Sequence, residues 1–406
     1  METKTPVVKN HWKIIAQIKQ TNPEIKLALC GDHVTALPRE SMENSKVDYV
    51  IEGGDYDFLL LNLVEYLNAR VKTLEAGIWY KENGEIKSTG PFRLDHDLNA
   101  LPFIDRDLTK WWLYSQKNGN YKKIPGTYTM VGRDCWWRKD GGCTFCAWPT
   151  LFPIFRVRKP ESLVEEVGIL IDRYGVREVF DDTGTFPVGN WLRKFCSLMI
   201  EKEYNNEVFF SCNMRFGALT REDYQLMKKA GFRMLLFGLE SGSQRFLDEI
   251  NKGVTVEEMI DSCKKAKEAG LEVHITIMFG YPNASRDEEF QTYRLARKLM
   301  EEGYADTLQS TLVMPYPGSR LYETALENGW LRFSPGEWEH WDMSEPVLKS
   351  ADMSPEEVKR MCDETYKLFL SPRYVLRRLL SIRSFEDLKF GFRGVRKVIG
   401  HIRDFG

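Results

Sequence analysis

Residues 220–242, TREDYQLMKKAGFRMLLFGLESG, hold a helix pattern that runs directly into a strand pattern. Thr220 is a favourable N-cap, acidic residues follow it, lysines come late, and Gly231 ends the helical pattern. The apolar run 233–240 then predicts a buried strand. This stretch therefore predicts one helix–strand unit of a parallel sheet, with polar and glycine residues following the strand.

The same alternation extends in both directions from this unit. Helices with comparable start and stop signals are predicted over 160–175 and 255–270. The six strands of the series are predicted over 128–134, 177–182, 207–214, 233–240, 273–280 and 307–314. Six such units predict an α/β fold, and their even spacing favours a curved, incomplete (β/α) barrel over a flat sheet.

The remaining chain predicts regions on both sides of this partial barrel. Helix patterns at 11–20 and 56–69 and strand patterns at 25–31 and 47–54 indicate a partial doubly wound, Rossmann-like domain. Turn signals and a proline-interrupted segment then indicate a linker. The expected division is 1–75 for the partial domain, 76–115 for the linker, 116–330 for the barrel and 331–406 for a helical C-terminal extension.

Charge and hydropathy limit the function classes. The chain holds 57 Lys and Arg against 59 Asp and Glu, a net charge of −2, so no global field recruits nucleic acid. No run approaches the roughly 18 apolar residues of a membrane span, and the first residues lack the apolar core of a signal peptide. We therefore expect a cytoplasmic protein whose thiols stay reduced.

Three of the eight cysteines are clustered in GRDCWWRKDGGCTFCAWP, residues 132–149. Cys135, Cys143 and Cys146 lack a nearby fourth ligand, whereas a closed structural zinc site prefers four. Three thiolates instead suit an iron–sulfur cluster with one iron open to an exogenous ligand, and a non-catalytic zinc scaffold is the alternative. The scattered cysteines, expected to be packing residues, are Cys30, Cys196, Cys212, Cys263 and Cys362.

A polar or glycine-rich cluster follows each of the six predicted strands. In β/α barrels the chemistry lies at the C-terminal ends of the strands, so these clusters are expected to line one mouth. They are the cysteine loop and the segments 181–184, 211–215, 238–242, 279–282 and 314–318.

The CTFC ending on the loop after the first strand of a six-unit β/α chain resembles the radical S-adenosylmethionine (SAM) superfamily. This resemblance implies that the three cysteines hold a [4Fe–4S] cluster whose unique iron is chelated by SAM, and that reductive cleavage gives a 5′-deoxyadenosyl radical for C–H activation. The loop between Cys135 and Cys143 is longer than is usual there, and Gly141 and Gly142 are expected to let it fold back.

The resemblance also implies SAM contacts after the later strands, although several of these residues have plainer readings as turn or surface-pair residues. The implied positions are Phe145 beside the adenine, Asp181, Asp182 and Thr183 at the methionyl amino group, Asn213 and Arg215 at the carboxylate, Glu240 and Ser241 at the ribose and amino group, and Gly280 in a glycine–proline turn.

Residues 27–67 resemble the closing half of the cobalamin-binding domain that precedes many radical enzymes of this type. The first 75 residues are too short for a complete doubly wound domain, so we expect this chain alone to bind cobalamin weakly or not at all. His33, in a glycine loop, is a candidate cobalt ligand, and a turn histidine is the more favoured reading.

The C-terminal stretch 371–406 carries nine Lys and Arg against three acids, interleaved with Leu, Ile and Phe. Such a basic amphipathic helix either lies on an anionic membrane surface or docks on its own barrel with a solvated basic face. Nucleic acid is not expected as a partner, because no aromatic platform accompanies the charge.

Residues 142–167, GCTFCAWPTLFPIFRVRKPESLVEEV, resemble the cobalamin-linked radical enzymes that remodel lipids or polyketide-like carbon skeletons. This implies methylation or rearrangement of a hydrophobic small molecule or lipid, with an electron donor such as flavodoxin or ferredoxin. Methylation or methylthiolation of RNA or a protein is the alternative.

Overall fold

The computed structural model describes the backbone of residues 1–117 and 121–405, together with their side chains other than those of 117, 397–399 and 401–405. The chain divides into two compact units, which we call the barrel unit and the N-terminal unit. The barrel unit is Leu98–Trp136, Arg156–Leu312 and Ser350–Gly406, and the N-terminal unit is Met1–Asp97, Trp137–Phe155 and Val313–Lys349.

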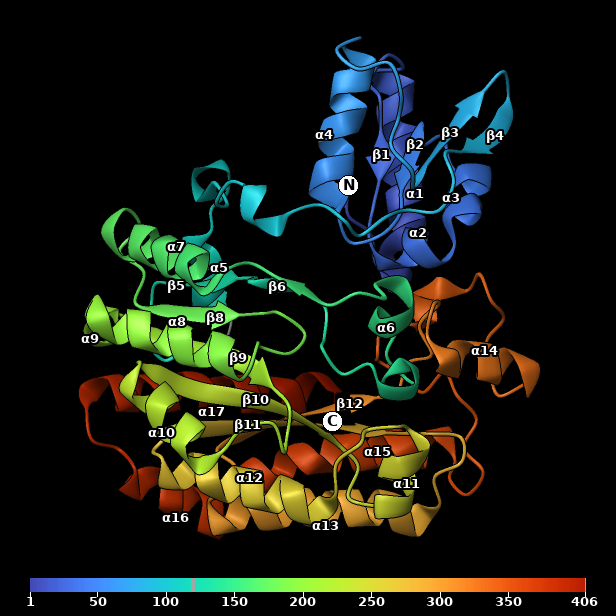
Figure 1. The fold of residues 1–406 in the computed structure, drawn as a ribbon. Helices are drawn as coiled ribbons and strands as arrows, with labels where there is room; N and C mark the ends of the chain where they lie inside the picture. The colour runs from blue at the N-terminus through green and yellow to red at the C-terminus, as the bar shows by residue number, and fades with distance from the viewer. Residues whose placement is uncertain (118–120, 406) are drawn as a thin grey trace. The chain divides into compact units, whose positions relative to one another are not determined.

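A six-stranded sheet forms the centre of the barrel unit, and all its neighbouring strands are parallel. Its strand order is β12-β11-β10-β9-β8-β5, so the chain adds strands in sequence across the curved sheet of Figure 1. This confirms the predicted partial barrel. The strands are β5 (Gly126–Thr129), β8 (Glu178–Asp181), β9 (Phe209–Met214), β10 (Phe232–Glu240), β11 (Glu272–Phe279) and β12 (Thr307–Leu312).

Helices cover the outer face of this sheet, and their ends follow the expected capping chemistry. Thr220 and Thr255 cap α10 and α12 in capping boxes with Asp223 and Glu258. Pro160 starts α7, where its missing N–H costs no hydrogen bond. The covering helices are α7 (Pro160–Asp172), α8 (Asn190–Glu201), α10 (Arg221–Lys229), α12 (Val256–Glu268) and α13 (Arg286–Glu302).

Between sheet and helices, aromatic side chains form the core. Phe210 of β9 and Phe232 of β10 have ring centroids 5.0 Å apart, and Phe195 of α8 lies 5.1 Å from Phe210. The other face of the sheet is less covered, because burial alternates along β11 and β12. Ile275 and Ile277 are fully buried, whereas Thr276 and Met278 between and beyond them are half-buried.

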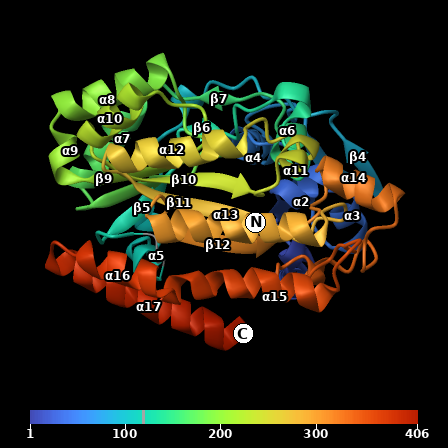
Figure 2. The same ribbon diagram turned by 90° about the horizontal axis from the view of Figure 1, so that it is seen from below.

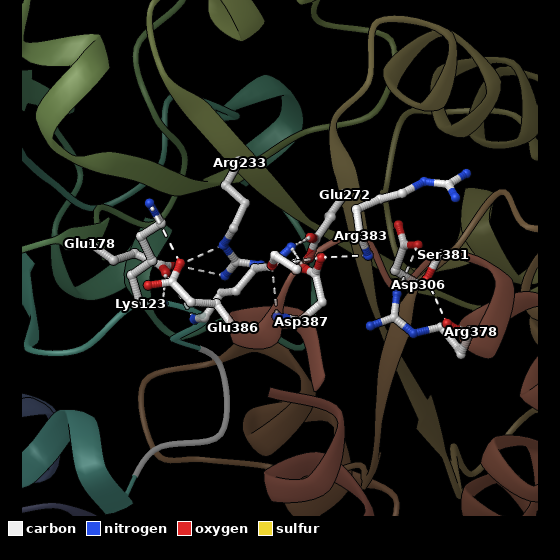
Figure 3. Close-up of polar contacts among 12 residues, drawn as sticks. Lys123, Glu178, Arg233, Glu272, Asp306, Arg378, Ser381, Arg383, Glu386 and Asp387 are labelled. Carbon is white, nitrogen blue, oxygen red and sulfur yellow. Dashed lines mark hydrogen bonds and ion pairs between the residues drawn. The ribbon is translucent and has the colours of Figure 1, made fainter. Parts of the chain in front are cut away.

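At the N-terminal ends of the strands lies a buried ion-pair network (Figure 3). Arg233, near the start of β10, bonds Glu178 of β8 at 2.6 Å and Glu272 of β11 at 2.6 Å. Glu178 also accepts the backbone N–H groups of Lys122 and Lys123 at 2.8 and 2.9 Å. The network therefore joins three strands and the segment before β5 at one end of the barrel unit.

The N-terminal unit contains a four-stranded sheet with the order β1-β2-β3-β4. The first pair is parallel, and the rest is antiparallel. The strands are β1 (Ala28–Leu29), β2 (Tyr49–Ile51), β3 (Ile78–Glu82) and β4 (Glu85–Ser88), and the helices before β3 are α1 (Val8–Thr21), α2 (Asp32–Ala36), α3 (Pro38–Asn44) and α4 (Tyr56–Leu67).

The β3–β4 hairpin lies within residues 76–115, which we expected to be a linker. Asn83 and Gly84 turn it, with φ angles of 51° and 85°. An Asn–Gly pair favours this two-residue turn, because both positions need positive φ. The hairpin extends the sheet of the N-terminal unit, so its structure differs from the expected division there.

The predicted C-terminal extension is helical and belongs mainly to the barrel unit. It comprises α15 (Pro355–Tyr366), α16 (Pro372–Leu380) and α17 (Phe385–Phe405). Figure 2 shows α15, α16 and α17, in red, along one side of the sheet, where α15 contacts β12 and β11. No helix in the described part of the chain is long and apolar enough to cross a membrane.

Candidate functional site

Because the six strands of the barrel unit are parallel, their C-terminal ends share one edge of the sheet, which we call the C-terminal rim. The residues that follow β8, β9, β10 and β11 therefore meet at this rim, as the sequence predicted.

Cys135 lies in the barrel unit, just after β6 (Gly132–Arg133), which pairs with β7 (Arg156–Val157). Its Sγ is 3.0 Å from Oγ1 of Thr185, a residue that follows β8. Gly132 N donates to Oγ1 of Thr183 at 2.9 Å, so β6 is held against the same segment. Cys135 is thus positioned by the segment after β8. The family resemblance implies that this same segment contacts the methionyl amino group of SAM.

Cys143 and Cys146 lie in the N-terminal unit, within a tightly turned segment. Cys146 N donates to the carbonyl of Cys143 at 3.2 Å. Gly141 and Gly142 have φ angles of 82° and 76°, which confirms that these glycines reverse the chain. A Cβ on Gly142 would lie 2.6 Å from Cγ of Pro149, so this position also has no room for a side chain.

Arg320, at the start of α14 (Arg320–Glu327), braces this cysteine loop. Its guanidinium donates to the carbonyl of Asp140 at 2.9 Å and to that of Gly142. The next residue, Leu321, donates its N–H to the carbonyl of Thr144 at 2.9 Å. Three carbonyls of the loop are therefore fixed by one helix start, which sequence reasoning did not single out.

The three loop cysteines and Cys30 are half-buried, whereas the other four cysteines are buried. All eight are free thiols. Cys135, Cys143 and Cys146 are half-buried, whereas burial raises the pKa of Cys196 and of Cys263 to about 12. Burial likewise raises the pKa of Cys212, Cys362 and Cys30, so these five thiols stay protonated as predicted for packing residues.

The donor set of the loop fits an iron–sulfur cluster better than zinc. It offers three thiols and no histidine, and soft thiolates are the usual ligands of such clusters. Within the described residues, no three His, Cys, Asp or Glu side chains are already arranged around a point where one metal ion could bind. Ligation by Cys135, Cys143 and Cys146 stays a prediction.

Asp181 is fully buried at the end of β8 and braces its neighbours. One carboxylate oxygen accepts from Thr129 Oγ1 at 3.0 Å and Val131 N at 2.9 Å, and the other accepts from Thr183 N at 3.2 Å. Burial raises the pKa of Asp181, and the hydrogen bonds from these neutral donors oppose that rise only in part. Of the predicted acidic pair, Asp182 is the exposed member.

Asn213 is the penultimate residue of β9, and Arg215 is the first residue after this strand. The Asn213 amide donates to Asp182 Oδ1 at 3.2 Å and to the Thr183 carbonyl at 3.1 Å. Arg215 is 8% exposed. The structure thus brings together three predicted positions, Asp182, Thr183 and Asn213, from two neighbouring strands; Phe145, by contrast, is a half-buried residue of the N-terminal unit.

Glu240 ends β10 in a strained conformation, with a φ angle of 63°. The residue is 7% exposed, and its carboxylate lies 2.8 Å from Nζ of Lys252. Gly238 makes room for this pair, since a Cβ there would lie 2.3 Å from Oε1 of Glu240. Lys252 lies 12 residues after Glu240, and its spacing alone gave no sign of this partner.

Ser241 is 4% exposed and holds the loop after β10 against α13. Its Oγ lies 3.2 Å from Oγ1 of Thr292, which also accepts Gly242 N at 2.9 Å. A Cβ on Gly242 would lie 2.6 Å from the carbonyl oxygen of Gln291, so only glycine permits this approach. The geometry assigns Ser241 a positioning contact within the protein.

Gly280 follows β11 with a φ angle of 94°. Its N–H donates to Oε1 of Glu289 at 2.9 Å. Glu289, on the first turns of α13, is 4% exposed, and burial raises its pKa to about 7. Glu289 therefore fixes the glycine–proline turn, and no sequence signal distinguished it from the other acids at this helix start.

His33 is buried in the N-terminal unit, and both ring nitrogens have partners. Nδ1 lies 3.2 Å from Oγ1 of Thr5, and Nε2 lies 2.8 Å from Oε2 of Glu40. Glu40 also accepts from Nε1 of Trp338 at 2.8 Å. These contacts favour a structural histidine over a cobalt ligand.

The barrel unit includes most of a known family domain. The Radical SAM superfamily model matches residues 130–296. An uncharacterised methyltransferase of Pyrococcus horikoshii, PH0819, is 27% identical over 94% of this chain and 80% of its own. A putative methylthiotransferase of Methanocaldococcus jannaschii, MJ0865, is 26% identical over 93% of this chain and 82% of its own.

A solved structure shares the fold. It is the radical SAM methyltransferase TsrM from Kitasatospora setae, determined with cobalamin and a [4Fe–4S] cluster, which aligns with a TM-score of 0.68 at 14% identity. The alignment covers 98% of this chain and 85% of TsrM. Residues 130–296 therefore carry a radical SAM domain, and the chain is an enzyme of the kind that uses SAM and a [4Fe–4S] cluster.

Proposed function

We propose that this enzyme methylates or rearranges a hydrophobic small molecule or lipid, with Cys135, Cys143 and Cys146 holding the cluster. The observation that carries the proposal is the parallel order of the six strands, which gathers the predicted SAM-binding segments at the C-terminal rim. When bound, the cluster supplies the electron that cleaves the carbon–sulfur bond of SAM. We also propose a flavodoxin or ferredoxin as reductant, in the cytoplasm, and a peripheral membrane contact through the basic C-terminal tail.

The residues of this chain have distinct parts in the proposal. Asp182 and Asn213 bind the amino acid moiety of SAM at the rim, and Phe145 meets the adenine. Asp181, Thr183 and Ser241 hold the loops that carry these groups, through the hydrogen bonds described above. Glu289 fixes the turn at Gly280.

The face of the sheet turned away from the helices supports a small, uncharged substrate. Among the residues of the six strands, all within the described part of the chain, Arg233 is the sole Lys or Arg, and it is buried in the network with Glu178 and Glu272. The exposed or half-buried residues of this sheet include Tyr128, Gln309, Thr276 and Met278. A surface that binds RNA is usually basic, and this one is not.

Anaerobic reconstitution tests the cluster assignment. Wild-type protein should bind about four irons per chain and show broad visible absorbance, as [4Fe–4S] proteins do. Cys135→Ala, Cys143→Ala and Cys146→Ala should each lose most of this iron, whereas Cys30→Ala, a half-buried cysteine outside the loop, should keep it. Full iron content in the three loop variants would refute the assignment.

A second candidate function is methylthiolation or methylation of RNA or a protein, which the likeness to MJ0865, a putative methylthiotransferase, supports. Comparing lipid extracts with modified nucleosides and proteins from a deletion strain separates the two. We expect a change in the lipid or small-molecule fraction. A change confined to nucleosides or proteins would favour the second function.

A further inference from the structure

We propose that the α16–α17 hairpin docks on an anionic lipid bilayer through an outward apolar face. The inference deepens the membrane contact of the proposed function, but it does not depend on the cluster. The hairpin is α16 and α17. The exposed apolar residues of its two helices, which we call the apolar face, are Val375, Leu376, Leu379, Leu380, Phe385, Leu388, Phe392 and Val395.

The hairpin face is unusually apolar for a solvent-exposed surface. Leu376, Leu380, Phe385 and Phe392 are 59%, 66%, 67% and 70% exposed. Along α16 the exposed residues recur at spacings of one and four, and along α17 at three and four, so each set lies on one side of its helix. Exposed apolar residues grouped in this way mark an interaction surface more often than a solvated one.

Basic side chains accompany this face. Arg373, Arg383, Lys389 and Arg396 are exposed residues of the hairpin. Residues 371–406 carry a net charge of +6, although the whole chain carries −2, so the other 370 residues carry −8. An anionic bilayer therefore attracts the hairpin and repels the rest of the chain, which fixes the orientation of approach. Each Lys or Arg near such a surface adds to this attraction.

The two acids at the start of α17 point toward the barrel unit. Glu386 bonds Arg177 at 2.9 Å and Lys123 at 3.7 Å, and Asp387 bonds Lys122 (Figure 3). Burial opposes ionisation of Asp387, but its hydrogen bonds, the first from Lys122, lower its pKa to about 2. The negative charge of this helix start is thus neutralised on the inner side.

The hairpin is also fixed at α16. Arg377 donates to the carbonyls of Ala305 and Met300 at 2.9 and 3.1 Å, and Arg378 pairs with Asp306 at 3.5 Å. Tyr374 Oη donates to the carbonyl of Asp306 at 2.9 Å. These contacts hold the inner sides of both helices on the barrel unit, so the apolar face is presented on a fixed support.

Charge argues for lipid over a second copy of this chain. Two hairpins packed face to face would bring their exposed Arg and Lys side chains together, and like charges across an interface oppose association. A bilayer with anionic headgroups satisfies both parts of the face, since its acyl region accepts Leu and Phe and its headgroups accept Arg and Lys.

Vesicle co-sedimentation of the full chain tests the proposal without cluster or SAM. Vesicles of phosphatidylcholine and phosphatidylglycerol should bind the protein, and vesicles of phosphatidylcholine alone should bind it at least about tenfold more weakly. Phe385→Ser/Phe392→Ser should lower the partition coefficient at least about tenfold. Leu60→Ser/Leu61→Ser, which removes exposed apolar residues of α4, should leave it unchanged.

Several results would overturn the proposal. They are equal binding to both vesicle types, an equal loss in the α4 control, absence of binding in the wild type, and self-association that Phe385→Ser/Phe392→Ser abolishes without any lipid binding. SAM cleavage by the reconstituted enzyme in vesicle-free solution should be the same in wild type and Phe385→Ser/Phe392→Ser. A failure of the lipid proposal is therefore distinguishable from a failure of the proposed function.

Discussion

Glu289 is a buried acid that fixes the glycine–proline turn after β11. The sequence identified this turn only by its glycine and proline. The carboxylate of Glu289 accepts the N–H of Gly280, and its pKa is raised to about 7 by burial. Between the ordinary pKa of about 4.5 and this value, the folded chain keeps a proton that the unfolded chain releases. The contribution of Glu289 to stability is therefore present below this window and is lost as pH rises through it.

Glu289→Gln removes this titration while keeping an acceptor for Gly280. We expect its free energy of unfolding to fall less than that of the wild type between pH 5 and pH 8, with a difference of up to about 3 kcal/mol. Urea unfolding at several pH values measures it. Glu302→Gln, an exposed acid at the end of the same helix, should behave as the wild type. Parallel pH profiles for wild type and Glu289→Gln would contradict the assignment.

The Glu240–Lys252 pair gives a second prediction at this scale. Lys252→Met leaves the carboxylate of the buried Glu240 without its cation, which should cost about 3 kcal/mol. Glu240→Gln/Lys252→Met should recover most of that loss in thermal unfolding. If Glu240 contacts SAM, the SAM affinity of the double variant, measured by calorimetry on reconstituted protein, should stay low. If stability and SAM affinity both recover, the role of Glu240 is purely structural.

At the scale of elements, the cysteine loop depends on α14. Arg320→Ala removes the donors to the carbonyls of Asp140 and Gly142, so the loop should hold its cysteines less firmly. We expect reconstituted iron to fall at least about twofold, while Arg320→Lys keeps an intermediate amount. Arg294→Ala, at an exposed ion pair of α13, is the matched control. Unchanged iron content in Arg320→Ala would show that the loop is held by other contacts.

The elements that were predictable are those whose signals are local. Strand patterns and the capping signals at Thr220 and Thr255 predicted the six strands and their helices, because burial periodicity and caps depend on stretches of about ten residues. Thr292 was not predictable, since it lies 50 residues after Gly242, whose N–H it accepts. Lys252 and Glu289 lie 12 and 9 residues after Glu240 and Gly280, but sequence spacing alone does not show that the chain folds back to form these pairs. The β3–β4 hairpin carried the Asn83–Gly84 signal, but its short, partly polar strands resembled a linker.

At the scale of the whole molecule, the buried network at the strand starts should govern stability. Arg233→Met leaves Glu178 and Glu272 without their shared cation and should cost about 3 to 5 kcal/mol. Thermal unfolding measures the loss. Arg294→Met, at an ion pair with both partners exposed, should change stability by less than about 1 kcal/mol. Equal effects of the two variants would mean that the buried network stabilises the fold no more than an exposed ion pair does.

Cobalamin binding is the other prediction at this scale. In the N-terminal unit the parallel part of the sheet is short: residues near Glu2 bridge to Cys30 beside β1, and β2 is followed by the antiparallel β3. With His33 engaged by Thr5 and Glu40, we expect this chain alone to bind hydroxocobalamin weakly or not at all. Stoichiometric co-elution of the corrin with the anaerobic protein in gel filtration would refute this.

The parallel sheet also separates its stabilising ion pairs from its candidate binding residues along the strand axis. Arg233, Glu178 and Glu272 lie at the strand starts, whereas Asp182, Asn213 and Glu240 lie at the strand ends. Substitutions that strengthen the first group can accumulate without touching the groups that we propose to bind SAM. A laboratory evolution campaign for new substrates should therefore begin from a variant made more heat-resistant at the strand starts. The added stability of that variant offsets the destabilising changes that new loops bring.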